Sequence, residues 1–119
     1  MKSYNDLIVW KKSVELSAEI YKIVKLLPKC ETYCLSDQMR RAAISVPSNI
    51  AEGQARKNTK EFIQFLRISK GSVAELETQM YVGCQISYFS EQQVENAFKL
   101  CAEVNKMLST IITRLENKQ

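Results

Sequence analysis

Residues 38–56 of this 119-residue chain read QMRRAAISVPSNIAEGQAR, and the stretch separates into two faces when it is placed on a helix. One face is small and apolar, as expected of a stripe that packs in a core, and it holds Met39, Ala43, Val46, Ile50 and Gly53. The other face carries good hydrogen-bonding groups instead of the lysines and glutamates of a solvated surface. We therefore predict a structural polar network made of Gln38, Arg41, Ser45, Asn49 and Glu52.

Pro47 lies in the middle of this stretch and cannot donate a backbone hydrogen bond to the carbonyl of Ala43. Both faces keep their phase across the proline, which favours one long helix with a kink at Pro47. The alternative is a turn built from Ser45, Pro47, Ser48 and Asn49. Arg41 and Glu52 are about three helical turns apart, so we expect their partners to come from other helices or subunits.

The chain before this stretch predicts a first helix with an unusually wide apolar face. Asn5 or Asp6 is expected to cap this helix, which should run to about Leu27 because Pro28 cannot continue it. Ser36 is then expected to cap the second helix. Two adjacent apolar stripes on the first helix exceed what one neighbouring helix covers, and this surplus predicts self-association.

Two capping-box patterns follow the central stretch. Asn58 and Ser90 are expected to cap a third and a fourth helix, which should run to about Ile86 and Leu115. The outer side of the third helix also carries a small-residue patch at which another backbone could approach closely, formed by Gly71 and Ala74. Four amphipathic helices with short connections predict an all-α, antiparallel up-down-up-down four-helix bundle, one domain over residues 1–119.

Composition argues against several classes of protein. Hydrophobic residues make up 45% of the chain and charged residues 25%, which is ordinary for a globular domain. No apolar run reaches roughly 18 residues and the first residues do not resemble a signal peptide, so a cytoplasmic protein is expected. Without histidine or a glycine-rich phosphate loop, we predict no catalytic residue, no enzyme activity and no cofactor. The cysteines are expected to be ordinary thiols and not a metal site; they are Cys30, Cys34, Cys84 and Cys101.

Positive charge is concentrated in one segment of the sequence. Residues 40–70 hold seven lysines and arginines and two glutamates, a net charge of +5, whereas the whole chain carries +4. An oligomer would repeat this charge, and repeated positive charge attracts phosphate backbones. Arg41 borders the polar face and is expected to be structural. The predicted nucleic-acid-binding residues are Arg40, Arg56, Lys57, Lys60, Arg67 and Lys70. The alternative is a solvated face that only keeps the protein soluble.

Three motifs resemble a known family. Residues 38–56 give Q-x-R-R-A-A-x-S-V-P-S-N-I-A-E-G-x-x-R, residues 7–12 read LIVWKK, and residues 61–80 read EFIQFLRISKGSVAELETQM. Together they are similar to the bacterial 23S rRNA intervening-sequence proteins, with Val46 where isoleucine is usual and Ser69 where alanine is usual, and the resemblance covers nearly the whole chain. The resemblance implies a four-helix bundle, a ring-like homopentamer and a link to ribosomal RNA.

The same pattern is similar to the accessory proteins of diversity-generating retroelements, which are basic pentameric bundles that act with a reverse transcriptase. We therefore predict a non-enzymatic homo-oligomer, most simply a pentamer, that binds structured RNA or a ribonucleoprotein related to 23S rRNA. Few aromatic residues accompany the basic segment, so contact with a duplex backbone is favoured over base stacking. The alternative is a protein-interaction scaffold or accessory subunit without nucleic-acid contact. Neither a membrane nor a small-molecule substrate is expected.

Overall fold

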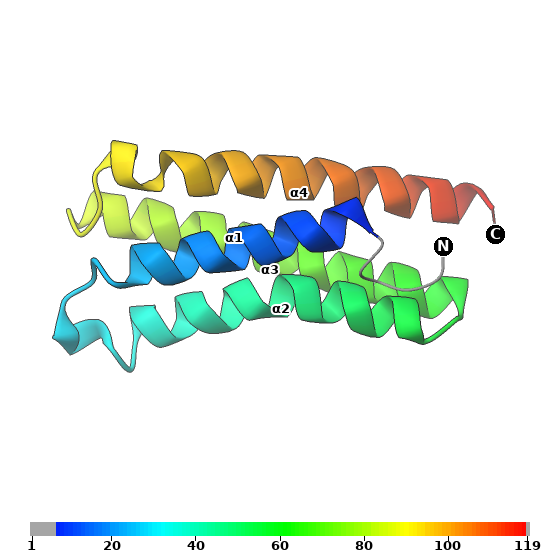
Figure 1. The fold of residues 1–119 in the computed structure, drawn as a ribbon, viewed down its shortest axis with the longest axis horizontal. Helices are drawn as coiled ribbons and strands as arrows, with labels where there is room; N and C mark the ends of the chain where they lie inside the picture. Colours follow the sequence, from blue (N-terminus) through cyan, green and yellow to red (C-terminus); the bar gives the residue numbers. More distant parts are fainter. Residues whose placement is uncertain (1–6, 119) are drawn as a thin grey trace.

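The computed structural model describes residues 7–118, and four long helices run antiparallel to one another in this part of the chain (Figure 1). They are α1 (Ile8–Val24), α2 (Leu35–Ala55), α3 (Thr59–Gln85) and α4 (Glu91–Asn117), with one 3-10 turn, η2 (Lys29–Glu31), between α1 and α2. Each helix packs against the two that are next to it around the bundle, and α4 closes the bundle against α1. The predicted all-α up-down-up-down four-helix bundle is confirmed.

The apolar stripes of the four helices meet in one core, where burial of each large side chain contributes about 1.5–3 kcal/mol. On α3 the apolar stripe that begins with the half-buried Phe62 is buried from Leu66 to Met80. The largest side chains with no more than 1% of their surface exposed come from all four helices, and they include Leu16, Ile20, Met39, Ile50, Leu66, Leu76, Met80 and Leu108. The 3.6-residue period therefore identified the core faces correctly.

Two predicted details of the helix ends differ in the structure. The first helix ends at Val24, three residues before the predicted Leu27, while its predicted caps, Asn5 and Asp6, lie outside the described residues. Ser36 does not cap α2; it is buried one position inside the helix, and Cys34 is the N-cap.

The reason lies in the turn that precedes α2. Residues Lys29–Glu31 fold into η2, and the Glu31 carboxylate accepts a hydrogen bond from the backbone N–H of Leu35 at 3.3 Å. The same carboxylate accepts a hydrogen bond from the hydroxyl of Tyr88 at 2.9 Å, which raises the pKa of Tyr88 to about 12. Glu31 therefore replaces a serine cap and also joins the α1–α2 connection to the α3–α4 connection.

The predicted caps of the other helices are present. The Asn58 side chain accepts a hydrogen bond from the backbone N–H of Glu61 at 3.0 Å. Ser90 and Gln93 form a complete capping box, because the side chain of each accepts a hydrogen bond from the backbone N–H of the other. Lys57, in the turn between α2 and α3, has a φ of 56°, a left-handed conformation that glycine adopts more easily.

The helix α2 continues through Pro47, as predicted, so the alternative of a turn at this position is wrong. Pro47 has no N–H to donate to the carbonyl oxygen of Ala43. That oxygen instead accepts a hydrogen bond from the buried Ser17 hydroxyl of α1 at 2.7 Å. The hydroxyl of Ser69 on α3 donates to the carbonyl of Val46 at 2.9 Å. Serines from both neighbouring helices thus bond to the backbone around the proline. The kink at Pro47 stays a prediction.

Glycines mark the closest approaches between elements. A Cβ atom added at Gly53 would lie 2.7 Å from the Cβ of Phe65, and one added at Gly83 would lie 2.4 Å from two ring carbons of Phe89. At Gly71, which is exposed like Ala74, an added Cβ would meet nothing within 4 Å. The close backbone approach predicted at Gly71 and Ala74 is therefore not made by any described residue of this chain.

Candidate nucleic-acid interface

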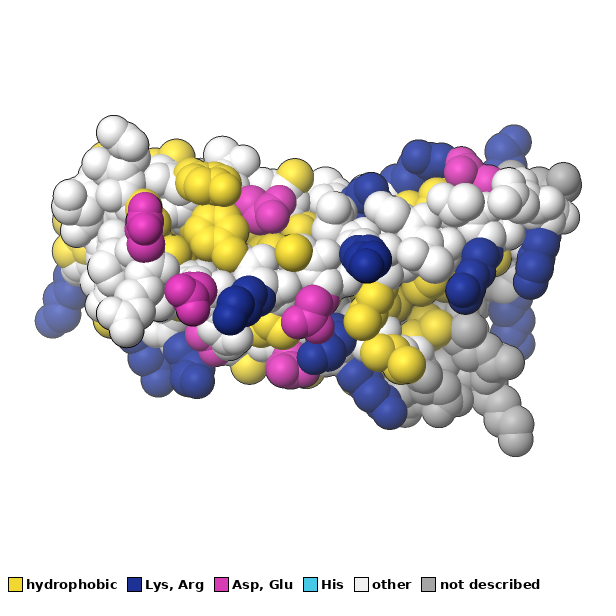
Figure 2. Space-filling view, turned by 90° about the horizontal axis from the view of Figure 1, so that it is seen from above, with side chains coloured by type: hydrophobic (Ala, Val, Ile, Leu, Met, Phe, Trp, Pro, Cys, Tyr) yellow, Lys and Arg dark blue, Asp and Glu magenta, His cyan; other side chains and the backbone are white. Residues whose placement is uncertain are grey.

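Charge is separated along the length of the bundle. Dividing the helices at their midpoints gives one half made of residues 8–16, 46–72 and 105–118, with ten lysines and arginines and four glutamates, a net charge of +6. The other half, residues 17–45 and 73–104, has six cations and eight anions, a net charge of −2. Figure 2 shows blue side chains crowded toward the right, where α4 ends, and most of the magenta ones to the left. We call the positive half the basic end.

Exposed cations of the basic end lie in the turn between α2 and α3 and at the start of α3. Lys57 and Lys60 are exposed, and neither has an ion-pair or hydrogen-bond partner among residues 7–118. Arg56 lies beside them but is already engaged: it pairs with Glu52 at 3.0 Å, and its guanidinium lies 5.1 Å from the centre of the Phe65 ring. Lys57 and Lys60 are therefore free to meet a phosphate without first breaking a contact.

Two further predicted residues line a shallow groove between α3 and α4. Arg67 forms an ion pair with Glu116, and the ammonium group of Lys70 donates to the hydroxyl of Ser109 at 2.7 Å. The lining of this groove is completed by Ile112 and Thr113. Both cations are thus held at fixed positions on the side of α3 that faces α4.

The sixth predicted residue lies elsewhere. Arg40 is sixteen positions before Arg56, about 24 Å at 1.5 Å per residue, and lies in the other half of the bundle. There its guanidinium donates to the carbonyl of Thr32 at 3.5 Å. The structure therefore brings five of the six predicted residues to the basic end and leaves Arg40 near the opposite end.

Sequence reasoning missed the cations that α1 and α4 bring to the basic end. These are Lys11, Lys12, Lys106, Arg114 and Lys118. They are far from residues 40–70 in the sequence, and only the antiparallel order of the helices places them at the same end. Of these, Lys12 is paired with Glu103 at 3.3 Å and Glu15 at 3.8 Å; the hydrogen bond to Glu103 contributes most to raising its pKa.

Only part of the predicted polar network is connected by hydrogen bonds. The Asn49 amide nitrogen donates to the Ser45 hydroxyl at 2.9 Å and to the Ser45 carbonyl at 2.8 Å, and the Ser72 hydroxyl of α3 donates to Ser45 at 2.8 Å. Gln38 is exposed at the edge of a separate hollow between α2 and α3. The polar face therefore bonds to α3 at its centre, where Ser45 accepts from Ser72, and not along its whole length; Asn49 bonds only to Ser45 within α2.

The partners expected for Arg41 and Glu52 were wrong. Arg41 pairs with Asp37 at 3.1 Å and Glu52 pairs with Arg56 at 3.0 Å, each four residues along α2 itself. Both pairs are exposed, so neither buries a charge. The i,i+4 spacing was visible in the sequence and is the simpler way to satisfy these side chains.

This pairing changes what removal of Glu52 should do. A Glu52→Ala variant is expected to lose less than about 1 kcal/mol of folding free energy, because exposed ion pairs contribute little and alanine favours the helix. Urea unfolding followed by circular dichroism measures this difference. A loss of several kcal/mol would mean that Glu52 is buried in an assembly of several copies.

The described residues contain no group of three or more cysteines and carboxylates that could hold a metal ion. Cys30 and Cys34 are exposed, whereas Cys101 is buried, and burial raises the pKa of its thiol to about 12. Within residues 7–118, no helix is both long enough and apolar enough to cross a membrane.

The fold and its charge define a class of small, all-α bundles with one strongly positive end. The family model described as 23S rRNA-intervening sequence protein matches residues 5–110, and the chain belongs to this family. It is also similar to a protein of unknown function from the S23 ribosomal protein family of Bacteroides thetaiotaomicron VPI-5482, known from a crystal structure at 1.70 Å resolution. The two share 27% sequence identity with a TM-score of 0.82, over 89% of this chain and 96% of that one. No curated protein matches the sequence.

Proposed function

We propose that this protein is a non-enzymatic, homo-oligomeric bundle that binds structured RNA, related to 23S rRNA, through its basic end. The observation that carries the proposal is the segregation of charge, +6 against −2, between the two halves of one small domain. A surface that only needed to be soluble would intersperse both signs, whereas a concentrated positive field attracts a phosphate backbone. Membership of the 23S rRNA-intervening sequence family supports RNA as that backbone.

The distribution of aromatic residues favours duplex RNA over single strands. The large exposed aromatic side chains of residues 7–118 are Tyr21, Tyr33 and Tyr81, and all three lie in the half opposite the basic end. At the basic end, Phe65 is only partly exposed and the Arg56 guanidinium lies over its ring. Stacking of unpaired bases needs open aromatic faces, whereas duplex RNA is held mainly through phosphates and 2′-hydroxyls.

Replacing Lys57 with glycine and Lys60 with alanine in one variant should weaken binding to a duplex-containing 23S rRNA fragment. Loss of two phosphate contacts should reduce the slope of log affinity against log salt by about two units. Glycine suits the left-handed φ at position 57, and Lys60 is exposed, so the variant should fold normally. Fluorescence titrations at three or more salt concentrations measure the affinity and the slope.

The matched control removes two exposed lysines from the other half, in a Lys25→Ala, Lys29→Ala variant. Its net charge equals that of the test variant, so any effect of total charge is shared. Equal losses in the two variants would show that the location of the charge is irrelevant and would contradict the proposal. Absence of wild-type binding at low salt would favour the protein-interaction scaffold without RNA contact.

The oligomeric part of the proposal rests on exposed apolar side chains. On α1, Ile8 is 67% exposed, Val14 41% and Tyr21 42%, and α2 adds Ile44 at 46%. Tyr21 and Ile44 line one hollow between α1 and α2, and exposed apolar side chains that neighbour one another across two helices favour contact with another copy. We expect size-exclusion chromatography with light scattering to give about five times 13.7 kDa, the mass of a pentamer. A single species of 13.7 kDa at micromolar concentration would contradict assembly.

A further inference from the structure

The half of the bundle opposite the basic end holds a second distinctive surface, an apolar groove between α3 and α4. Its lining comes from Tyr81 and Cys84 on α3 and, on α4, from Glu91, Val94, Glu95, Phe98, Lys99 and Ala102. We call it the aromatic groove. Its volume of about 520 Å³ suits one or two side chains of a peptide and is too small for a folded domain.

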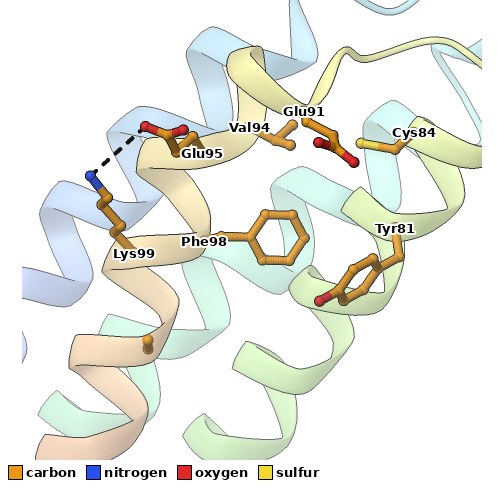
Figure 3. Close-up of a pocket in the computed structure, with 8 residues that line it drawn as sticks. Tyr81, Cys84, Glu91, Val94, Glu95, Phe98 and Lys99 are labelled. Carbon is orange, nitrogen blue, oxygen red and sulfur yellow. Dashed lines mark ion pairs between the residues drawn. The ribbon is translucent and has the colours of Figure 1, made fainter.

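Two aromatic rings form the floor of the aromatic groove. Tyr81 and Phe98 point toward each other across the space between the helices (Figure 3), with ring centres 4.8 Å apart and planes tilted by 50°. Tyr81 remains 66% exposed although it belongs to this pair. An aromatic face open to solvent attracts a cation, and a flat guanidinium makes the best contact because it can stack on the ring.

Negative charge surrounds these rings. Glu91 extends from the start of α4 toward Cys84 (Figure 3) and has no ion-pair partner among the described residues. Burial raises the pKa of the Cys84 thiol, and the charge of Glu91 raises it further. Glu77 lies one turn before Tyr81 on the same face of α3. Glu95 and Lys99, which also line the groove, pair with each other at 3.8 Å and together add no net charge. The groove therefore presents an apolar floor between unneutralised carboxylates.

We propose that the aromatic groove binds a segment of a partner protein that carries an arginine beside an aliphatic residue. The guanidinium stacks on Tyr81 and pairs with Glu91, while the aliphatic side chain covers Phe98 and Ala102. Residues 73–104, which contain most of the groove, include five glutamates and one lysine, so a basic segment is complementary to the whole surface. This site is separate from the RNA surface proposed above and lies at the other end of the bundle.

A second copy of the same chain offers this site few arginines without an ion pair. Three of the five arginines of this chain, Arg41, Arg56 and Arg67, already pair with carboxylates of their own chain. Each would have to give up that pair before entering the groove of a neighbour. An arginine on a flexible segment of another protein has no such pair to lose.

The test uses fluorescence anisotropy of a short, fluorescein-labelled peptide in which arginine and leucine are spaced by serine. Binding to the wild-type protein is expected, and Tyr81→Ala and Glu91→Gln should each weaken it about tenfold. Tyr33→Ala removes an exposed tyrosine elsewhere, and Glu61→Gln removes a carboxylate from the first turn of α3 as Glu91→Gln does from α4. Both controls should bind the peptide as the wild type does.

A second measurement locates the peptide. In a Cys30→Ser, Cys34→Ser background only the half-buried Cys84 is accessible, because Cys101 is buried, and the peptide should slow alkylation of Cys84 by N-ethylmaleimide. Unchanged affinity in Tyr81→Ala, or equal binding of a peptide with glutamate in place of arginine, would overturn the proposal. A change of oligomer mass in Tyr81→Ala would also overturn it, because the occupant would then be a second copy.

Discussion

A Gly83→Ala variant is expected to unfold at clearly lower urea concentration than the wild type, with a loss of about 2 kcal/mol. The new methyl group would lie 2.4 Å from two ring carbons of Phe89, which is only 4% exposed and cannot swing away. Overpacking of this kind costs about 1–3 kcal/mol, and moving Phe89 also disturbs its backbone. The N–H groups of Tyr88 and Phe89 both donate to the Gly83 carbonyl, at 2.8 and 3.3 Å.

The matched control is Gly71→Ala, the same chemical change on the same helix. An alanine at position 71 meets open space, so it should raise stability by up to about 1 kcal/mol through its better helix propensity. The two variants should therefore differ by about 3 kcal/mol at equal protein concentration. Similar stabilities would show that the α3–α4 connection can move to admit the methyl group. A destabilised Gly71→Ala variant would place that glycine in an interface between copies.

The sequence predicted the helices and core faces because both depend on local periodicity. Stripes such as those of α3 and α4 are read from spacing alone, and the Asn58 and Ser90 caps depend on residues three positions apart. Gly53 was placed in the core stripe for the same reason. Ser36 was misread because the group that serves the start of α2, Glu31, belongs to a separate turn. A capping pattern in the sequence does not reveal a carboxylate supplied by a neighbouring element.

The candidate site was predicted less completely because it depends on how distant segments meet. A count over residues 40–70 included Arg40, which the length of α2 places far from Lys57, and omitted Lys106 and Arg114, which α4 brings back to the same end. The exposed ion pairs on α2, Arg41–Asp37 and Glu52–Arg56, were missed for the opposite reason. Their partners were four residues away, but the apparent shortage of lysine on that face suggested burial.

The second large effect on folding stability is expected from removing the hydrogen bond that the Ser17 hydroxyl donates to the Ala43 carbonyl. Ser17→Ala is expected to cost about 1–3 kcal/mol, because it leaves a buried carbonyl oxygen without a donor. Ser13→Ala is the control, since Ser13 is also buried but its hydroxyl donates to the carbonyl of Trp10 within the same helix. That carbonyl keeps its ordinary helical N–H partner, so the control should lose much less stability than Ser17→Ala.

A double-mutant cycle with Pro47→Ala identifies why Ser17→Ala lowers the stability. Alanine at position 47 restores the N–H that a helix normally offers to the Ala43 carbonyl, so the Ser17 hydroxyl becomes redundant. In the Pro47→Ala background, Ser17→Ala should therefore cost at least about 1 kcal/mol less than in the wild type. Urea unfolding of the four proteins at one concentration supplies the coupling free energy. Additive losses, equal within about 0.5 kcal/mol, would mean that Ser17 acts through packing and does not replace the donor that the proline removed.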